Sequence, residues 1–300
     1  MEGGVLRRLE LTFTSGGLKC SGWLFLPEGA RKPPVVVMAH GFAAEKVFRL
    51  PAYAENFCAE GLAVFLFDYR HFGESEGLPR NLVSVKRQLE DWRSALEYVR
   101  SLKEVDGERV ALWGTSFSGG HVLVTAAQDQ KVSAVVAQVP FVDGLATASY
   151  LGLGFVLKAT VHGLMDAVAS TLGRVHYVPV VSDPDKFAIM NTPGSKEGYL
   201  SLIPEGSSWK NECPARILLS IPFYRPVRYA SKIKCPVLIL YAEKDSLIPP
   251  EAVRKTASKI RNVKVVCLDV GHFDVYFDPV FSETTKIETE FLKENLEKRS

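Results

Sequence analysis

The sequence predicts a doubly wound, mainly parallel α/β sheet that carries an inserted, largely helical cap. Short continuous apolar runs recur along the chain, and amphipathic helical patterns lie between them. One long stretch, residues 141–230, interrupts this alternation. Because strands and helices alternate, right-handed crossovers should place helices on both faces of the sheet and ligands beyond the carboxyl ends of the strands.

The chain opens with a predicted β-hairpin. Residues 9–14 alternate apolar and polar side chains, Ser15-Gly16-Gly17 supplies a turn, and residues 18–27 are again rich in strand formers. An antiparallel edge should therefore start the sheet. Five continuous apolar runs follow, as expected of strands covered on both faces: residues 35–39, 62–68, 110–113, 132–139 and 237–241.

The clearest helical pattern follows the second of these runs. Apolar residues spaced three and four apart draw one stripe along it, namely Leu82, Val85, Leu89, Trp92, Leu96 and Val99. This spacing predicts a helix that covers one face of the sheet.

Residues 141–230 do not read as a short strand-to-strand connection. Helical segments, glycines, prolines and aromatic residues fill the stretch, and a strand-like run resumes at residues 236–241. We therefore expect residues 1–140 and 231–300 to form one core, with 141–230 inserted as a cap. A separate domain is the alternative.

The composition is that of an ordinary soluble globular protein, with 47% hydrophobic and 23% charged residues in 300. The 36 Lys and Arg nearly balance the 34 Asp and Glu, so no nucleic-acid partner is expected. No apolar run approaches transmembrane length, and residues 1–8 lack the apolar core of a signal peptide. We expect a cytoplasmic protein, and the sequence leaves its oligomeric state open.

Five cysteines are scattered along the chain without the Cys-x-x-Cys spacing of a metal or redox site. None lies in a glycine-rich turn after a strand, where a cysteine nucleophile would be expected. We interpret them as buried or incidental thiols and expect no metal site.

The sharpest local signal is a serine between small residues. The apolar run 110–113 leads into Gly114-Thr115-Ser116-Phe117-Ser118, and Gly119-Gly120 follows. A sharp turn from strand to helix needs small residues so that the serine Oγ stands clear of the sheet at the positive end of the helix. Ser118 occupies the position usually held by a second glycine. An ordinary Gly-Ser turn is the alternative.

A serine hydroxyl is a weak nucleophile without a base to take its proton and a carboxylate to orient that base. Asp245 follows the predicted strand 237–241, and His272 follows another predicted strand. Rival carboxylates are Glu243, Asp269 and Asp274, and rival bases include His40 and His121. Asp245 is favoured because it lies directly before the loop that contains Pro249-Pro250.

Attack by a serine would also place a negative charge on the carbonyl oxygen of the substrate, and fixed hydrogen-bond donors must stabilise this oxyanion. His40-Gly41-Phe42 follows the predicted strand 35–39, so the backbone N–H of Phe42 can join that of Phe117, the residue after the serine. A simple strand-ending turn is the alternative for His40-Gly41.

Together these segments resemble the α/β-hydrolase superfamily: residues 40–42, Asp68-Tyr69-Arg70-His71-Phe72-Gly73-Glu74-Ser75, the Ser116 turn, the Asp245 loop and Gly271-His272. The resemblance implies the fold, a Ser116–His272–Asp245 triad and an oxyanion hole from Phe42 and Phe117. In the family the stretch beginning at Asp68 is a structural loop, so Asp68 and Arg70 receive no catalytic role.

The predicted cap resembles the substrate-selecting lid of lipases and esterases. Its large apolar and aromatic residues either bind an apolar acyl or aryl group or pack the cap itself. These residues are Phe155, Leu164, Met165, Tyr177, Phe187, Met190, Trp209, Phe223 and Tyr224.

The leading functional interpretation is hydrolysis of carboxylic esters of short to medium acyl chains through an acyl-enzyme, with no metal or cofactor required. An acyl-CoA thioesterase or acyltransferase is the first alternative, with CoA or an acyl-CoA as ligand. Four basic residues are available for its phosphates: Lys158, Arg174, Arg225 and Arg228.

A catalytically silent binding protein is the alternative from another class. Peptidase activity is disfavoured because no anchor for a peptide terminus is evident. Haloalkane dehalogenase chemistry would need an aspartate in place of Ser116.

Overall fold

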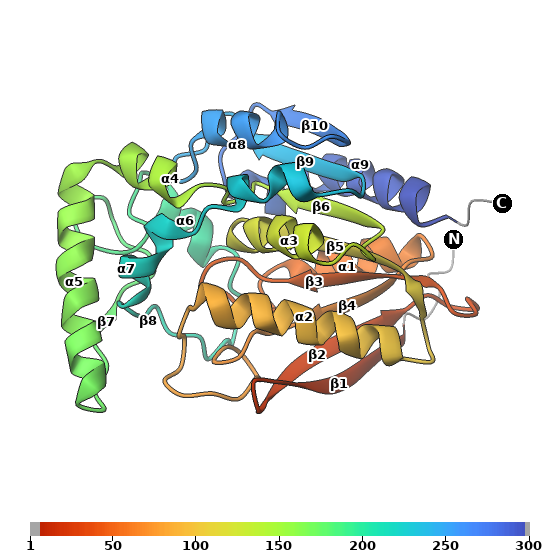
Figure 1. Cartoon of the computed structure of the whole chain (residues 1–300), viewed down its shortest axis with the longest axis horizontal. Helices are drawn as coiled ribbons and strands as arrows, with labels where there is room; N and C mark the ends of the chain where they lie inside the picture. The colour runs from red at the N-terminus through yellow and green to blue at the C-terminus, as the bar shows by residue number, and fades with distance from the viewer. Residues whose placement is uncertain (1–6, 298–300) are drawn as a thin grey trace.

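The computed structural model describes residues 7–297, so residues 1–6, inspected above for a leader, lie outside it together with 298–300. Eight strands form one sheet in the order β1-β2-β4-β3-β5-β6-β9-β10 (Figure 1). The strands are β1 (Arg7–Ser15), β2 (Leu18–Leu26), β3 (Pro34–Ala39), β4 (Ala63–Phe67), β5 (Asp106–Thr115), β6 (Ala134–Gln138), β9 (Val237–Ala242) and β10 (Val263–Leu268).

The directions of the strands confirm the predicted topology. Strands β1 and β2 form an antiparallel hairpin at the sheet edge, and β2 also runs antiparallel to β4. From β4 to β10 all neighbouring strands are parallel. The carboxyl ends of the parallel strands therefore meet at one edge of the sheet, where the loops after β3, β5, β9 and β10 lie together.

Helices cover both faces of the sheet, with α2 and α3 in front and α1 and α9 behind in the view of Figure 1. Their bounds are α1 (Leu50–Ala59), α2 (Val85–Ser101), α3 (Phe117–Gln128), α8 (Pro250–Ala257), the 3₁₀ helix η4 (Asp274–Tyr276) and α9 (Val280–Leu296). The helix predicted from the apolar pattern that starts at Leu82 begins about one turn later than expected. Ser84 has an extended backbone, so α2 starts at Val85, and Leu82 is buried in the preceding loop.

The central strands explain the continuous apolar runs of the sequence. Every residue of β4, β6 and β9 is buried, as are all residues of β3 after Pro34. A strand with helices on both faces has no side that can accept polar residues, so alternation is lost.

The segment between β6 and β9 is largely helical. It contains α4 (Gly144–Leu151), α5 (Leu153–Thr171), α6 (Ser195–Leu200), α7 (Ile217–Ser220), η1 (Ile221–Phe223), η2 (Pro226–Arg228) and η3 (Ala230–Lys232). A small antiparallel pair, β7 (Tyr177–Val178) and β8 (Cys213–Pro214), completes it. Helix α5 stands at the left edge of the molecule in Figure 1, away from the sheet.

Within residues 7–297, no single helix has the length and apolar composition needed to cross a membrane. Helices α4 and α5 meet those criteria only when taken together, and they are bent by 115° where they join.

The turn from β5 to α3 holds Ser116 in a left-handed backbone conformation, with φ of 54°. The Ser116 N–H donates to the carbonyl of Gln138 (2.9 Å), and the Phe141 N–H donates to the carbonyl of Ser116 (2.8 Å). The turn is thus tied to the end of β6 on both sides. Gly114 is required here, because a Cβ at this position would lie 2.4 Å from the carbonyl oxygen of Ser118.

Ser118, the departure from the usual glycine, has a structural partner. Its hydroxyl lies 2.9 Å from the Tyr69 hydroxyl, which also accepts a hydrogen bond from the Trp92 indole (2.8 Å). All three side chains are buried. The Ser118 hydroxyl therefore links the start of α3 to the loop that follows β4 and, through Tyr69, to α2.

Glu288 on α9 is a fully buried acid beneath the sheet. The Trp113 indole donates to it (3.0 Å), while its second carboxyl oxygen has no hydrogen-bond partner among the described residues. Burial raises the pKa of Glu288 from 4.5 to about 8. The side chain is therefore a neutral acid at neutral pH in the folded protein.

This buried acid makes stability depend on pH. Because the pKa is higher in the folded than in the unfolded chain, Glu288 contributes stability at low pH that is lost as the pH rises from about 4.5 toward about 8. The variant Glu288→Gln stays neutral at every pH. Its free energy of unfolding should therefore rise relative to that of the wild type by about 1 kcal/mol for each pH unit across that range. Urea unfolding at a series of pH values measures the difference. The exposed Glu290→Gln on the same helix is the control, and a pH-independent difference for Glu288→Gln would contradict the account.

Ser118→Ala should lower the free energy of unfolding by about 1 to 2 kcal/mol, because the buried Tyr69 hydroxyl loses a partner. Tyr69→Phe should be comparably destabilising. The double variant should cost clearly less than the sum, since both changes remove one network. Strict additivity in this cycle, measured by chemical denaturation, would show that the two hydroxyls are not coupled.

Candidate active site

Three side chains from separate loops meet at the carboxyl edge of the sheet. Ser116 follows β5, Asp245 follows β9 and His272 follows β10. His272 Nε2 lies 3.1 Å from Ser116 Oγ, and His272 Nδ1 lies 2.6 Å from Asp245 Oδ2. Residues separated by up to 156 positions in the sequence thus form one continuous hydrogen-bonded chain.

Asp245 is fixed by its own loop. Its Oδ1 accepts hydrogen bonds from the backbone N–H groups of Leu247 (2.8 Å) and Ile248 (2.9 Å), which leaves Oδ2 for His272. A carboxylate can only accept, so His272 Nδ1 carries the proton and the lone pair of Nε2 faces Ser116 Oγ. This arrangement allows the imidazole to take a proton from the serine.

The rival carboxylates are engaged elsewhere. Glu243 pairs with Arg254 (2.7 Å), and Asp269 pairs with Lys244 (2.9 Å), both near the surface. Asp274 accepts a hydrogen bond from the backbone N–H of Gly271 (2.7 Å). Asp245 is the carboxylate that contacts the His272 ring.

The rival histidines are buried and hydrogen-bond to groups other than Ser116. His40 Nδ1 donates to the carbonyl of Gly41 (3.0 Å), and burial lowers the pKa of His40 to about 4. His121 lies between Tyr224 Oη (2.7 Å) and Gln88 Oε1 (3.0 Å), and burial lowers its pKa to about 3. Both rings are neutral hydrogen-bonding groups of the core.

The predicted oxyanion-hole residues lie close to each other and to Ser116. Phe42 in the loop after β3 and Phe117 at the start of α3 line the same cavity as the serine. The Phe117 N–H belongs to the first turn of α3 and has no acceptor within the helix. The loop after β3 passes so close that a Cβ on Gly41 would lie 3.2 Å from the Ser116 Cβ.

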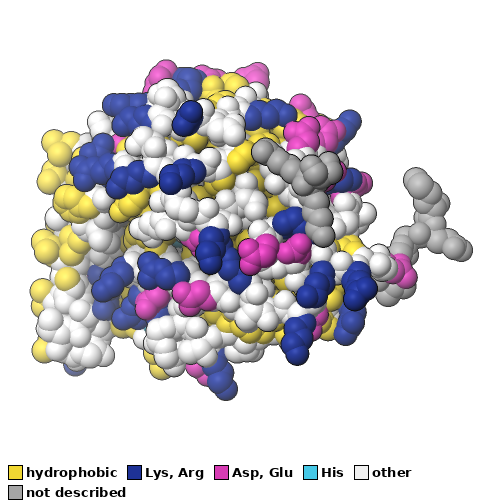
Figure 2. Space-filling model, turned by 45° about the vertical axis from the view of Figure 1, so that its right-hand side comes forward, with side chains coloured by type: hydrophobic (Ala, Val, Ile, Leu, Met, Phe, Trp, Pro, Cys, Tyr) yellow, Lys and Arg dark blue, Asp and Glu magenta, His cyan; other side chains and the backbone are white. Residues whose placement is uncertain are grey.

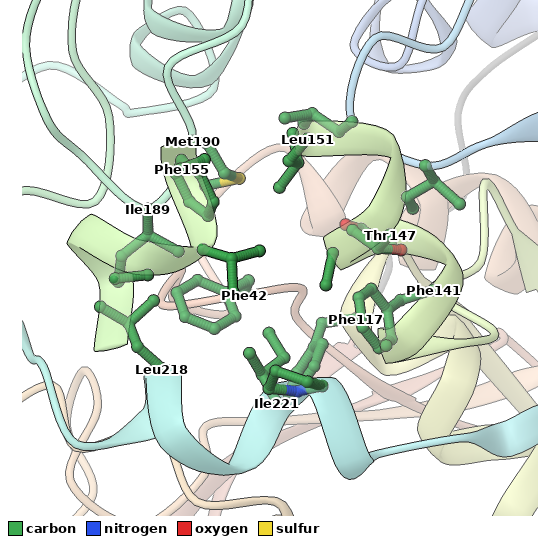
Figure 3. A pocket seen from close by; sticks show the side chains of 18 of the residues that line it. Phe42, Phe117, Phe141, Thr147, Leu151, Phe155, Ile189, Met190, Leu218 and Ile221 are labelled. Carbon is green, nitrogen blue, oxygen red and sulfur yellow. The ribbon is translucent and has the colours of Figure 1, made fainter. Parts of the chain in front are cut away.

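Ser116 opens into an apolar cavity of about 110 Å³, shown in Figure 3. The cavity lies between α4, which contributes Thr147 and Leu151, and α5, which contributes Phe155. No side chain in its lining carries a charge. The other lining residues are Phe42, Phe117, Phe141, Gly144, Ala148, Val156, Ala159, Thr160, Ile189, Met190, Leu218, Ile221, Pro222, Leu247 and Ile248.

Two of the predicted cap residues line this cavity, Phe155 and Met190. Leu164, Met165 and Phe223 point to solvent instead.

The remaining predicted cap residues do not line this cavity. The Trp209 indole donates to the carbonyl of Ala43 (2.8 Å), and the Tyr224 ring stacks on Phe141. Phe187 lines a neighbouring hollow, and Tyr177 belongs to β7.

Sequence reasoning missed most of the lining. Ala148 and Leu151 on α4 and Leu218 on α7 are ordinary small or aliphatic residues, which carry no signal of function. Leu247 and Ile248 could have been found, because they directly follow Asp245 and their N–H groups bind it.

Asp68 and Arg70 take part in buried ion pairs outside the site. Lys46 donates to Asp68 through both its backbone N–H and its Nζ, at 2.7 Å each. Arg70 pairs with Asp91 and Glu90 on α2. Both acidic–basic clusters brace the loop after β4.

The basic residues considered for phosphate binding divide into two groups. Lys158 lines a second hollow of about 480 Å³ together with Lys186 and Asp185, and this hollow shares Leu151 and Phe155 with the apolar cavity. Arg225 is bound to Asp143 (2.7 Å) and is not available. Arg174 and Arg228 are exposed.

The described cysteines form no disulfide. Three are buried, Cys235 is partly buried and Cys267 is exposed, and no cluster of three or more potential metal ligands occurs within residues 7–297. Burial raises the pKa of Cys58 to about 11, which keeps its thiol protonated and unreactive.

Comparisons with known proteins agree with this architecture. The chain is 41% identical to the quorum-quenching protein AidA of Acinetobacter baumannii over 95% of this chain and 94% of that protein. It is 25% identical to the thiohydrolase apmlB of Arthrinium phaeospermum over 99% of both chains. The structure of DcsB in complex with its substrate analogue superposes with a TM-score of 0.84 at 24% identity, covering 96% of this chain and 100% of that one.

The family comparison covers six of the eight strands of the sheet, from β3 to β10. Residues 34–279 match the model of the alpha/beta hydrolase fold family, and the match includes Ser116, Asp245 and His272. The family and the names of its relatives, which also include a polyketide transferase of Penicillium sp, support an enzyme that performs hydrolysis or acyl transfer. The chain is a member of the alpha/beta hydrolase family.

Proposed function

We propose that this protein hydrolyses carboxylic esters with short to medium acyl chains, using Ser116 as nucleophile, His272 as base and Asp245 as the carboxylate that orients the base. One observation carries the proposal. The Ser116 Oγ is hydrogen-bonded to His272 Nε2 at the wall of a cavity whose lining is apolar and uncharged. Such a cavity suits the hydrocarbon part of an acyl group next to the reacting carbonyl.

The first chemical step follows from the hydrogen bonds. Ser116 Oγ attacks the ester carbonyl carbon while His272 Nε2 takes its proton, and Asp245 stabilises the imidazolium that forms. The electron pair of the carbonyl moves to its oxygen, where the backbone N–H groups of Phe42 and Phe117 are the proposed donors. Collapse of this intermediate expels the alcohol, which takes the proton from His272.

The second step regenerates the enzyme. His272 takes a proton from water, the resulting hydroxide attacks the acyl-Ser116 ester, and the acid leaves as the proton returns to Ser116 Oγ. The same acyl-enzyme transfers its acyl group when another nucleophile replaces water.

Residues 141–230 act as a cap in this proposal, on the core formed by 1–140 and 231–300. Helices α4 and α5 and the residues Leu218 and Ile221 supply one wall of the cavity, whereas Phe42 and Phe117 come from the core. The cap therefore sets the length and width of the acyl group, and the core supplies the reacting groups.

The relatives also indicate a class of substrate. The 41% identity to a quorum-quenching protein suggests a signal molecule as substrate. The proposed triad and the apolar cavity would then fit a signal molecule that contains an ester bond and an apolar acyl chain, such as an acylated lactone. A lactone is an internal ester and uses the same two steps. Incubating the enzyme with an acylated lactone and measuring the ring-opened acid tests this extension.

Thioester cleavage or acyl transfer is the second candidate. It is supported by the relative named a thiohydrolase and by the hollow beside the cavity, where Lys158 and Lys186 can meet the phosphates of a CoA thioester. Acyl-CoA substrates assayed beside p-nitrophenyl esters separate the two. If Lys158→Ala raises KM for octanoyl-CoA while leaving octanoate ester hydrolysis unchanged, the thioester becomes the preferred substrate class.

Ser116→Ala should reduce hydrolysis of p-nitrophenyl butyrate by a factor on the order of 10³ or more, because it removes the nucleophile. Ser118→Ala is the matched control, since this neighbouring serine lies outside the triad, and its turnover should stay near that of the wild type. Labelling with a fluorophosphonate should occur in the wild type and fail in Ser116→Ala. A well-folded wild type that neither reacts with the label nor turns over any ester or thioester would indicate a binding protein.

Narrowing the cavity should change chain-length preference. Ala159 on α5 lines the cavity, so Ala159→Phe should lower kcat/KM for the octanoate ester by about 10-fold or more while sparing the acetate ester. Ala169→Phe, on the same helix but outside the lining, is the control. Equal losses on acetate and octanoate would contradict binding of the acyl chain in this cavity.

A further inference from the structure

Exposed hydrophobic residues are concentrated on the outward face of α5. Among residues 7–297, thirteen large hydrophobic side chains are exposed, and seven of them lie on α5 or its C-terminal cap. We call these seven the α5 stripe: Leu153, Leu157, Val161, Leu164, Met165, Val168 and Leu172. Figure 2 shows hydrophobic side chains gathered along the left edge of the molecule, where α5 stands.

The stripe is extended and regular. Leu157, Val161, Leu164 and Val168 follow one another at spacings of four, three and four residues, the pattern of a helix that packs lengthwise against another helix. Their side chains are 53–64% exposed, so the protomer itself leaves this seam uncovered.

The stripe is also almost free of charge. Lys158 is the one exposed charged residue of α5, because Asp166 is fully buried and bound to Arg216 (2.6 Å). A surface with a row of like charges would repel its own copy, whereas this surface does not.

The size of the stripe fits a protein interface. Its seven residues are 49–73% exposed, which corresponds to roughly 700 Å² of surface, more than the largest apolar patch of a typical monomer. Each partner of a standard protein–protein interface contributes about 800 Å². The stripe together with the flanking parts of α5 therefore approaches half of a stable dimer interface.

We propose that two copies of this chain associate through the α5 stripe, with the same surface used by both partners about a two-fold axis. A second copy offers the complementary surface, namely another uncharged, heptad-like row of aliphatic side chains.

A lipid bilayer is a poorer match to the same stripe. Interfacial helices flank their apolar face with several Lys or Arg residues for anionic headgroups. Helix α5 carries one exposed basic residue, Lys158, with Arg174 just beyond its end and Lys186 in the hollow beside it. The 115° bend between α4 and α5 also prevents the two apolar helices from lying along one line.

The dimer contact lies on the opposite side of α5 from the cavity. Phe155, Val156, Ala159 and Thr160 of the same helix line the cavity beside Ser116. A partner packed on the stripe therefore holds the cavity wall in place, although it contributes no residue to the triad.

Analytical ultracentrifugation of the full chain tests the proposal. The wild type should sediment as a dimer at tens of micromolar, and the double variant Val161→Glu/Leu164→Glu should sediment as a monomer. Leu78→Glu is the matched control, because Leu78 is 81% exposed on a different surface, and this variant should remain dimeric. A monomeric wild type, or a double variant that remains dimeric, would overturn the proposal.

Two further measurements distinguish loss of the dimer contact from misfolding of the double variant. Circular dichroism spectra should match among the three proteins, because the substituted residues are exposed, and the double variant should melt cooperatively at a temperature lowered by the loss of the dimer. If the double variant is misfolded, cysteine cross-linking replaces it. In a Cys267→Ser background, which removes the exposed native thiol, Leu164→Cys should form a covalent dimer on oxidation and Leu78→Cys should not. A wild type that stays monomeric but floats with phosphatidylglycerol vesicles would assign the stripe to a membrane and refute the dimer.

Discussion

The arrangement of the site depends on the constrained turn at Ser116. Its backbone adopts a positive φ, and hydrogen bonds to Gln138 and from Phe141 hold it against the end of β6. The small residues around it let α3 begin immediately, so the serine oxygen stands at the helix N-terminus and clear of the sheet. The remaining parts of the site are placed by the same sheet edge, since parallel strands deliver Asp245 and His272 to the level of Ser116.

The titratable side chains near Ser116 divide into those that form a hydrogen-bonded chain with it and those that hydrogen-bond within the core. Asp245 is held by two backbone N–H groups and gives its remaining oxygen to His272, while the histidines at 40 and 121 are neutralised by burial in the core. The cavity beyond the serine offers no charge. In the proposed reaction, the acyl group binds there through apolar contact, and the polar chemistry is confined to the carbonyl.

Most of the sheet and the meeting of the three side chains could be predicted from the sequence. Continuous apolar runs mark buried parallel strands, and residues after such strands must converge at one edge. The cavity lining could not be predicted, because aliphatic residues such as Leu218 have the same pattern whether they pack a core or contact a ligand. Leu164 and Met165 were candidates for the lining, yet α5 turns them to solvent, and sequence periodicity alone cannot tell which helix face meets the cavity.

The most direct test of the account is to trap the acyl-enzyme. The wild type would be mixed with p-nitrophenyl octanoate, quenched in acid within its first turnovers, digested and analysed by mass spectrometry. The account predicts one octanoyl group on the peptide that contains Ser116, attached to that serine, and no adduct after prior fluorophosphonate treatment. Rapid turnover with no acyl group on Ser116, or with the acyl group on another residue, would contradict it.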